Sequence, residues 1–323
     1  MVRFLVERGV DVSARNDKGD TPLERAMMYG NYELARSLIE FGADVHVVGS
    51  GGGSLLHQAL RRDEVPLDIL GMLMRKGLAV DCRDGLGCTP LHFAKEPEVV
   101  EFLIKNGADV NAQSHRGFTP LSRTIVYSIG RRWPDGRTLT KFKILLKNGA
   151  VLRLADHKGR TPLHYAARCE MLAFIKGLLR EGADVHARDE HGHTPLHCAT
   201  TENNRVDRIR LLLDSGADVH ATDNEGKTPL FGMARLRKAG LEELIRHGGD
   251  VNARDAKGNT LLHTMVRMPL YKSTERDSII PLLVDNGIDI GAKNNDSKTV
   301  FEVAEERGDK DLLEYLSPYR PHE

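Results

Sequence analysis

Three histidines and a cysteine fall within eight consecutive residues, in the stretch HGHTPLHC from His191 to Cys198. Imidazole nitrogen and thiolate sulfur are preferred ligands of zinc and copper, so this composition is typical of a metal site. The alternative is a structural role, in which His197 makes hydrogen bonds inside a helical element. His191 and His193 would then be exposed on the loop around Gly192. The place of these residues in the rest of the chain decides between the two interpretations.

The composition of the chain excludes several classes of protein. It has 323 residues, of which 40% are hydrophobic, and 46 basic residues balance 46 acidic ones. The balanced charge provides no bulk attraction to nucleic acid or to a lipid surface. No apolar run approaches the roughly 20 residues of a membrane-spanning helix, and the charged start MVRFLVERG is unlike a secretory signal. The four cysteines form no C-x-x-C pair, so we expect reduced cysteines and a cytoplasmic or nuclear chain.

The TPLH part of the stretch is one copy of a motif that recurs along the whole chain. Its variants begin at Thr21, Ser54, Thr89, Thr119, Thr161, Thr228, Thr260 and Thr299. A second motif, GADVNA or GADVHA, alternates with it, with copies at Gly42, Gly107, Gly182, Gly216 and, as GGDVNA, Gly248. Together the two motifs resemble the ankyrin repeat, over residues 1 to about 317. The resemblance implies a hydrogen-bonded structural histidine at the end of TPLH. It also implies protein partners that bind the hairpin tips and, on the concave face, the exposed ends of the first helices.

The residues of each unit indicate an architecture of short helix pairs. A threonine before a proline and an apolar run starts a helix, because the hydroxyl caps free amides and proline at the first position loses no hydrogen bond. A second helical run ends at a glycine suited to a left-handed conformation. Neither helix buries its apolar face alone, so neighbouring units must stack. We therefore predict an all-α fold of helix pairs with short β-hairpin turns, an ankyrin-repeat solenoid of about nine repeats plus an N-terminal half repeat.

The spacing of the motifs predicts the boundaries of the repeats. Each helix-ending glycine is followed 12 positions later by the motif Thr or Ser, whereas the distance onward to the next glycine varies. The variation places insertions between the two helices of a repeat, the largest at 128–140 and 267–277. We expect one domain, 1–317, with a partial repeat at 1–16 and a short tail at 318–323. The partial repeat lacks a polar cap, so either the sequence is truncated or another molecule covers this end. Full repeats should start near residues 17, 50, 85, 115, 157, 190, 224, 256 and 295.

Stacking of the repeats also argues against a metal site. Tip histidines of successive repeats, such as His115, His157 and His191, would lie ~8 to 10 Å apart, whereas nitrogens that share a zinc lie within about 4 Å. We therefore predict no metal and no cofactor. Ser, His and Asp recur because the motif supplies them, so their co-occurrence indicates no catalytic triad and we expect no enzyme activity.

The positions that the resemblance assigns to partner contacts are mostly basic. Basic residues outnumber acidic ones there by about two to one, on a chain without net charge. Arg61, Arg168, Arg235 and Arg267 share one helix position, and a row of guanidinium groups suits the carboxylates of an acidic protein segment. The predicted protein-binding residues are Arg61, Arg62, Arg116, Tyr127, Trp133, Lys158, Arg160, Arg168, His191, His193, Arg235 and Arg267.

Alternatives to a basic protein-binding face remain open. The arginines are also explained as ordinary solvated helix ends. Trp133, the only tryptophan, is either a binding anchor or a residue that pins its own insertion to the stack. The insertions of repeats four and eight provide the place for an enzymatic, metal or small-ligand module. A basic face also fits a polyanion such as RNA or a phosphoinositide, although the 5% aromatic content argues against recognition by base stacking. We expect a monomer that acts as a protein-interaction scaffold.

Overall fold

The computed structural model describes residues 2–49, 51–62, 64–129, 136–201, 206–232, 238–266 and 273–320. These residues form helices joined by turns, and the described ranges contain no β-strand. Among these helices, none combines the length and the apolar composition needed to span a bilayer. The chain divides into two compact units, Met1–His157 and Lys158–Glu323. The boundary of a single domain at 317 stays a prediction.

The first unit is built from pairs of short helices. They are α1 (Val2–Glu7), α2 (Pro22–Tyr29), α3 (Tyr32–Glu40), α4 (Leu55–Leu60), α5 (Leu67–Arg75), α6 (Pro90–Phe93), α7 (Pro97–Lys105), α8 (Pro120–Val126) and α9 (Gly136–Lys147). The first helices of neighbouring repeats pack on one another, α2 on α4, α4 on α6 and α6 on α8. Among the second helices, α3 packs on α5 and α7 packs on α9. Each contact therefore joins a repeat to its neighbour.

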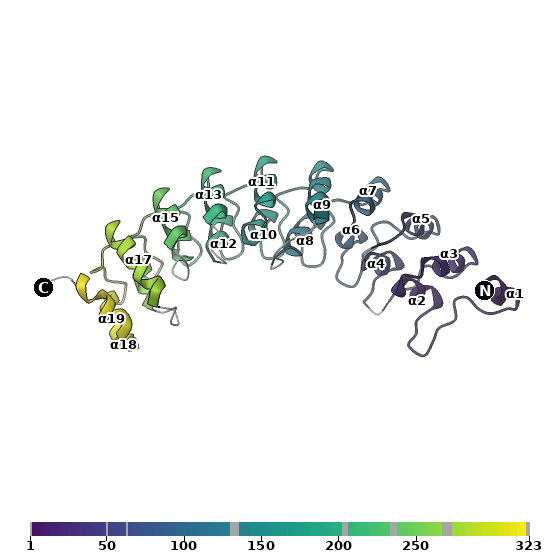
Figure 1. The fold of residues 1–323 in the computed structure, drawn as a ribbon, viewed down its shortest axis with the longest axis horizontal. Helices are drawn as coiled ribbons and strands as arrows, with labels where there is room; N and C mark the ends of the chain where they lie inside the picture. The colour runs from purple at the N-terminus through teal and green to yellow at the C-terminus, as the bar shows by residue number, and fades with distance from the viewer. Residues whose placement is uncertain are drawn as a thin grey trace. The chain divides into compact units, whose positions relative to one another are not determined.

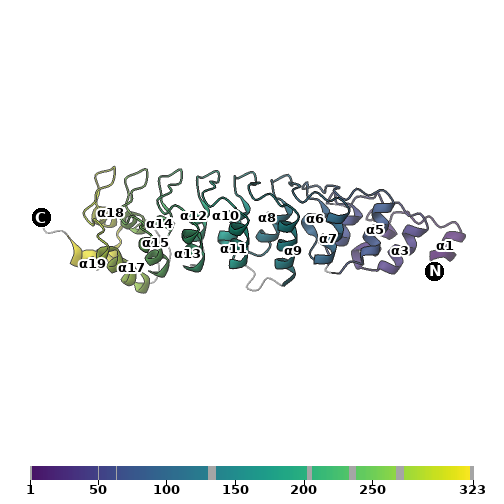
Figure 2. The same ribbon diagram turned by 90° about the horizontal axis from the view of Figure 1, so that it is seen from above.

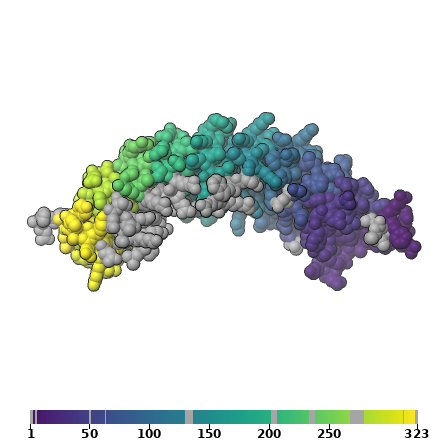
Figure 3. All heavy atoms as spheres, viewed as in Figure 1, coloured from purple at the N-terminus to yellow at the C-terminus, as the bar shows by residue number. Residues whose placement is uncertain are grey.

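The second unit repeats this arrangement. Its helices are α10 (Pro162–Arg168), α11 (Leu172–Arg180), α12 (Pro195–Thr201), α13 (Val206–Asp214), α14 (Pro229–Gly232), α15 (Lys238–Arg246), α16 (Leu261–Val266), α17 (Ser273–Asp285), α18 (Val300–Arg307) and α19 (Lys310–Leu316), followed by the 3-10 helix η2 (Ser317–Tyr319). Within the unit, α10, α12, α14, α16 and α18 pack in series, and α11, α13, α15 and α17 form a second layer (Figure 1). The hairpin loops of this unit project side by side from one edge of the helices (Figure 2). Side chains fill the space between neighbouring ribbons (Figure 3).

The motif threonines start the first helices, as the sequence predicts. Thr161 has extended backbone, and α10 begins at Pro162 directly after it. The motif leucine on the next position is buried, with Leu163 only 1% exposed. At Thr21 and Thr299 the hydroxyl accepts a hydrogen bond from the backbone amide of a glutamate three residues on, and the carboxylate of that glutamate accepts one from the threonine amide. Local capping and burial of the apolar face thus fix where each helix begins.

The helix-ending glycines have the left-handed backbone that the sequence predicts. Gly42 has φ of 89° and directly follows the C-cap of α3, and the amide of Ala43 donates to the carbonyl of Leu38 at 2.9 Å. This closing turn satisfies carbonyls that the helix end leaves free. A second set of positive φ values falls on the hairpin tips, two residues before the motif Thr or Ser. There the last repeat carries Ser297, at φ of 60°, in place of a glycine.

The motif histidines join neighbouring repeats. The ring of His164 lies with Nδ1 2.9 Å from the hydroxyl of Thr161 and with Nε2 3.0 Å from the carbonyl of His193 in the next hairpin. Because the Thr161 amide donates to Nδ1, the proton belongs on Nε2, which donates to the carbonyl. Equivalent links run from His57 to Cys88, His92 to Phe118, His197 to Lys227 and His263 to Lys298.

Candidate functional site

The histidine-rich stretch is part of this repeat framework. His197 is 4% exposed, and its ring bridges Thr194 and the carbonyl of Lys227. Burial lowers the pKa of His197, which favours the neutral ring that these bonds require. The ring nitrogens of His193 lie 3.5 Å from the carboxylates of Asp189 and Asp223, and Nε2 of His191 lies 3.5 Å from the carboxylate of Glu190. The described residues contain no group of three or more His, Cys, Asp or Glu side chains arranged to hold a metal ion.

The predicted protein-binding residues fall in different places. Trp133, Arg235 and Arg267 lie outside the described residues. In the second unit Lys158 pairs with Glu190 at 3.5 Å, and Arg160 lies on the ring of Tyr165 at 5.0 Å. Arg168 is the half-buried last residue of α10. In the first unit Arg116 is exposed at a hairpin tip, whereas Arg61, Arg62 and Tyr127 lie at the ends of first helices and line two hollows.

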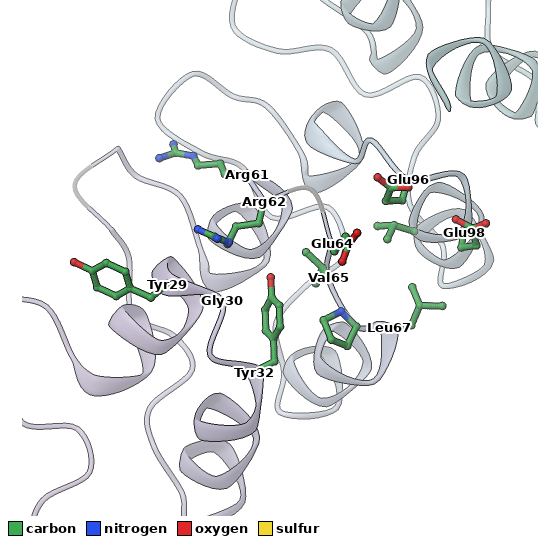
Figure 4. A pocket seen from close by; sticks show the side chains of 12 residues that line it. Tyr29, Gly30, Tyr32, Arg61, Arg62, Glu64, Val65, Leu67, Glu96 and Glu98 are labelled. Carbon is green, nitrogen blue, oxygen red and sulfur yellow. The ribbon is translucent and has the colours of Figure 1, made fainter. Parts of the chain in front are cut away.

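The first hollow lies between the helix-helix connections of the first three repeats (Figure 4). Its volume is about 910 Å³, and Arg61 and Arg62 lie on one side of it while Glu96 and Glu98 lie on the other. The Arg62 guanidinium donates to the carbonyl of Met28 at 3.0 Å and so satisfies the end of α2. This hollow therefore carries both signs of charge.

Tyr32 adds a polar group to the first hollow. Its hydroxyl is buried and has no hydrogen-bond partner among the described residues. Burial raises the pKa of Tyr32, and the nearby Arg62 opposes that rise. In Figure 4 the ring stands with its hydroxyl towards Arg62. The Tyr32 hydroxyl is therefore an unsatisfied polar group buried beside the first hollow.

The second hollow shares Arg61 with the first and has a volume of about 480 Å³. Its wall contains four cationic side chains and, among the residues that line it, no carboxylate. Apolar and aromatic atoms come from Leu60, Phe93 and Tyr127, and Tyr127 is 55% exposed. The cationic residues are Arg61, Lys95, Arg123 and Lys141.

Lys141 is buried at the bottom of the second hollow. It is 5% exposed, and its ammonium donates to the carbonyls of Ala94 at 2.6 Å and Leu91 at 3.3 Å. Burial, with a smaller contribution from Arg123, lowers the pKa of Lys141 from 10.5 to about 7. Burial, with smaller contributions from Lys141 and Arg123, likewise lowers the pKa of His92 to about 4. The like charges in this hollow therefore destabilise one another's charged forms.

Sequence reasoning did not identify Lys141, although a signal exists. The position eight residues before each helix-ending glycine is apolar at Ile69, Val99 and Phe174, which are all buried. Lysine occupies it at 141 and arginine at 208. Arg208 is also buried, and it donates to the carbonyls of Ala167 and Cys169 at the end of α10. Both cations thus satisfy carbonyls at the end of the preceding repeat's first helix, where the helix dipole favours positive charge.

Comparison with known families agrees with this geometry. The model described as "Ankyrin repeats (3 copies)" matches residues 38–114, 135–223 and 201–294, and the model "Ankyrin repeat" matches residues 18–47. The chain belongs to the ankyrin-repeat family. The predicted all-α ankyrin fold is thereby confirmed. Ankyrin repeats generally mediate protein-protein interaction and are generally non-catalytic.

Individual relatives match only part of the chain. It is 35% identical over 127 residues to the palmitoyltransferase AKR1 of Lachancea kluyveri, covering 38% of this chain and 17% of that protein. It is 33% identical over 128 residues to the potassium channel AKT2/3 of Arabidopsis thaliana, covering 38% and 15%. It is 30% identical over 109 residues to the nuclear factor NF-kappa-B p105 subunit of Gallus gallus, covering 32% and 11%. Since the chain spans less than a fifth of these relatives, the likeness concerns their repeats.

Proposed function

We propose that this chain is a non-catalytic scaffold of the cytoplasm or nucleus that binds an acidic segment of a partner protein. The observation that supports the proposal is the second hollow, where Arg61, Lys95 and Arg123 gather around the partly charged Lys141 without a lining carboxylate, on a chain of zero net charge. A cationic recess favours negatively charged ligands and suppresses cationic ones, because like charges across an interface repel. Arginine supplies two parallel donors that match a carboxylate.

The surface around this recess has the composition of a binding site. Arginine and tyrosine are enriched among residues that dominate binding energy, and Arg61, Arg62, Tyr29 and Tyr127 are all exposed here. Tyrosine contributes a large contact area at low cost in conformational entropy. We infer that the partner lies across the first-helix ends and the adjoining hairpin tips.

Charge reversal with a matched control tests the proposal. One variant combines Arg61→Glu, Arg116→Glu and Arg168→Glu. The control combines Arg75→Glu, Arg153→Glu and Arg180→Glu, which are exposed, as Arg61 and Arg116 are, but lie at second-helix ends and after a helix-ending glycine. Both triple variants change the net charge by the same amount, so bulk electrostatics cancels between them.

The partner is captured from a lysate of the source cell by the native chain, identified by mass spectrometry, and its most acidic segment is synthesised as a peptide. We expect the native chain and the control to bind this peptide equally, and the first variant to bind at least tenfold more weakly. Binding should also weaken as salt is raised from 50 to 300 mM, because exposed charges are screened. Equal binding by all three proteins, or a captured partner that binds without an acidic segment, would contradict the proposal.

A further inference from the structure

A shortened helix creates the second hollow. Helix α6 has four residues, whereas the neighbouring first helices α4 and α8 have six and seven. Only 18 positions separate Thr89 from Gly107, the smallest such interval in the chain. Because α6 packs between α4 and α8, its missing turn leaves a recess between Leu60 and Arg61 on one side and Tyr127 on the other.

Lys141 closes the bottom of the recess, and Arg61, Lys95 and Arg123 around it give the recess its positive charge. The Lys141 ammonium satisfies the carbonyls of Leu91 and Ala94, which a longer α6 would have bonded within the helix. Two N–H groups of the ammonium form are thereby used, and because the pKa of Lys141 is about 7 this group is only partly charged near neutral pH. Lys141 thus stabilises the end of the short α6, and the recess above it stays open.

Arg123 is held in place for a ligand. Its guanidinium lies over the ring of Phe93, at 4.5 Å from the ring centroid, and the side chain is half-buried. A guanidinium fixed against an aromatic ring loses little conformational freedom when it binds, so it recognises a planar anion at low entropic cost. Arg61 and Lys95 are exposed at the rim of the same recess.

We propose that this recess binds the carboxylate side chain of one aspartate or glutamate in the partner's acidic segment. Arg123 provides the paired donors, Arg61 and Lys95 add charge at the rim, and Phe93 and Tyr127 cover the methylene groups and an adjoining apolar residue. A recess of about 480 Å³ accommodates two side chains of this kind. The inference rests on the proposed function, and it assigns the recognition of one carboxylate to one site.

A selection that requires no knowledge of the natural partner tests this site. The full chain is used to select from a phage-displayed library of random 12-residue peptides, with the Arg123→Gln variant as a counter-selection. We expect peptides enriched in Asp or Glu next to an apolar residue. Arg123→Gln should weaken the best of them at least tenfold, whereas Arg153→Gln, at an exposed arginine outside the recess, should change its affinity less than twofold.

A change on the peptide keeps the test independent of protein folding. Replacing the key peptide Glu with Gln should weaken binding to the native chain at least tenfold, but weaken binding to the Arg123→Gln variant less than twofold. This non-additivity shows that the two groups contact each other. Peptides without acidic enrichment, or equal losses in both proteins, would overturn the inference.

Other outcomes separate this inference from the proposed function. If acidic peptides bind independently of Arg123 but are lost with Arg61→Glu, Arg116→Glu and Arg168→Glu combined, the recess is wrong and the scaffold proposal stands. Vesicles with 5% phosphatidylinositol bisphosphate and a 20-nucleotide RNA are the remaining probes. If either probe binds tenfold more tightly than the best peptide, and this binding is lost in the Arg123→Gln variant, the recess recognises phosphate. That result would overturn the proposal that it binds a carboxylate.

Discussion

Replacing Lys141 with methionine should remove a pH dependence of stability that this buried ammonium creates. Methionine has a similar length and no charge, so the change tests the charge with little loss of volume. Burial holds the pKa of Lys141 at about 7 in the folded chain, against 10.5 when exposed. Between these values the unfolded chain binds more protons than the folded chain, so stability rises as pH increases from about 7 towards 10.5. Below pH 7 both states are protonated, and the full cost of burying the charge, about 5 kcal/mol, is present.

The size of the effect follows from the same two values. Between pH 6 and pH 9 the native chain should gain about 3 kcal/mol from Lys141, and the Lys141→Met variant should lack this gain. The assay is urea unfolding at both pH values, followed by circular dichroism, with Lys143→Met as a control at an exposed lysine of the same helix. Loss of the hydrogen bonds to Leu91 and Ala94 lowers stability at both pH values and cancels in the difference. Titration of the cysteines cancels for the same reason. A pH difference that is the same in the native chain and in Lys141→Met would refute the reasoning, because it would mean that the folded chain keeps the ammonium charged.

Three further predictions concern single residues of the repeat framework. Burial holds the pKa of His92 at about 4, so the unfolded chain binds more protons than the folded chain between pH 6.5 and 4. The free energy of unfolding should therefore decrease as the pH is lowered, by about 2 kcal/mol between pH 7 and 4.5. His92→Gln, which retains a capping group, should reduce this fall in urea unfolding, and an unchanged fall would assign the acid sensitivity elsewhere. Ser297 has φ of 60° where other tips carry glycine, so Ser297→Gly should stabilise the chain by about 1 kcal/mol, and Gly19→Ser, at an open position with φ of 80°, should lose a similar amount in thermal unfolding. A loss of stability in Ser297→Gly, or a gain in Gly19→Ser, would contradict the backbone argument. Gly49 occupies the hairpin position that Asp189 holds in a later repeat, where its carboxylate accepts hydrogen bonds from two backbone amides. Gly49→Asp should therefore stabilise the chain by about 1 to 2 kcal/mol once the flexible end of Gln58 moves aside. An unchanged melting temperature would show that these amides are already satisfied.

The sequence predicts the framework well because local chemistry determines it. The helix start at Thr161 follows from one hydroxyl, one proline and one buried leucine, and the turn at Gly42 follows from one left-handed residue. Each of these interactions spans a few residues and recurs in register. The role of His197 also followed, because the motif repeats the same ring beside the same threonine.

The second hollow could not be predicted in the same way, because it depends on two repeats at once. One repeat has a shortened first helix, and the next repeat carries Lys141. The short interval after Thr89 is visible in the sequence, but whether the space collapses depends on Lys141, which is 52 residues further along. Arg123 and Phe93 come from different helices, and only packing brings them together. Position rules drawn from the family assign contacts repeat by repeat, so they do not identify a site made by unequal repeats.

The histidine links have a consequence for how the protein is made. Each joins a ring to a carbonyl only 26 to 35 residues later in the chain, at His92 and His263 for the two extremes. A ribosome adds about 5 to 20 residues per second, so each repeat waits roughly 1 to 7 s for the neighbour that completes its hydrogen bonds. A repeat array of this kind can add stability one interface at a time, because folding propagates between neighbours. During synthesis the apolar surface at the growing end is therefore limited to that of one repeat, because each new repeat covers the one before it.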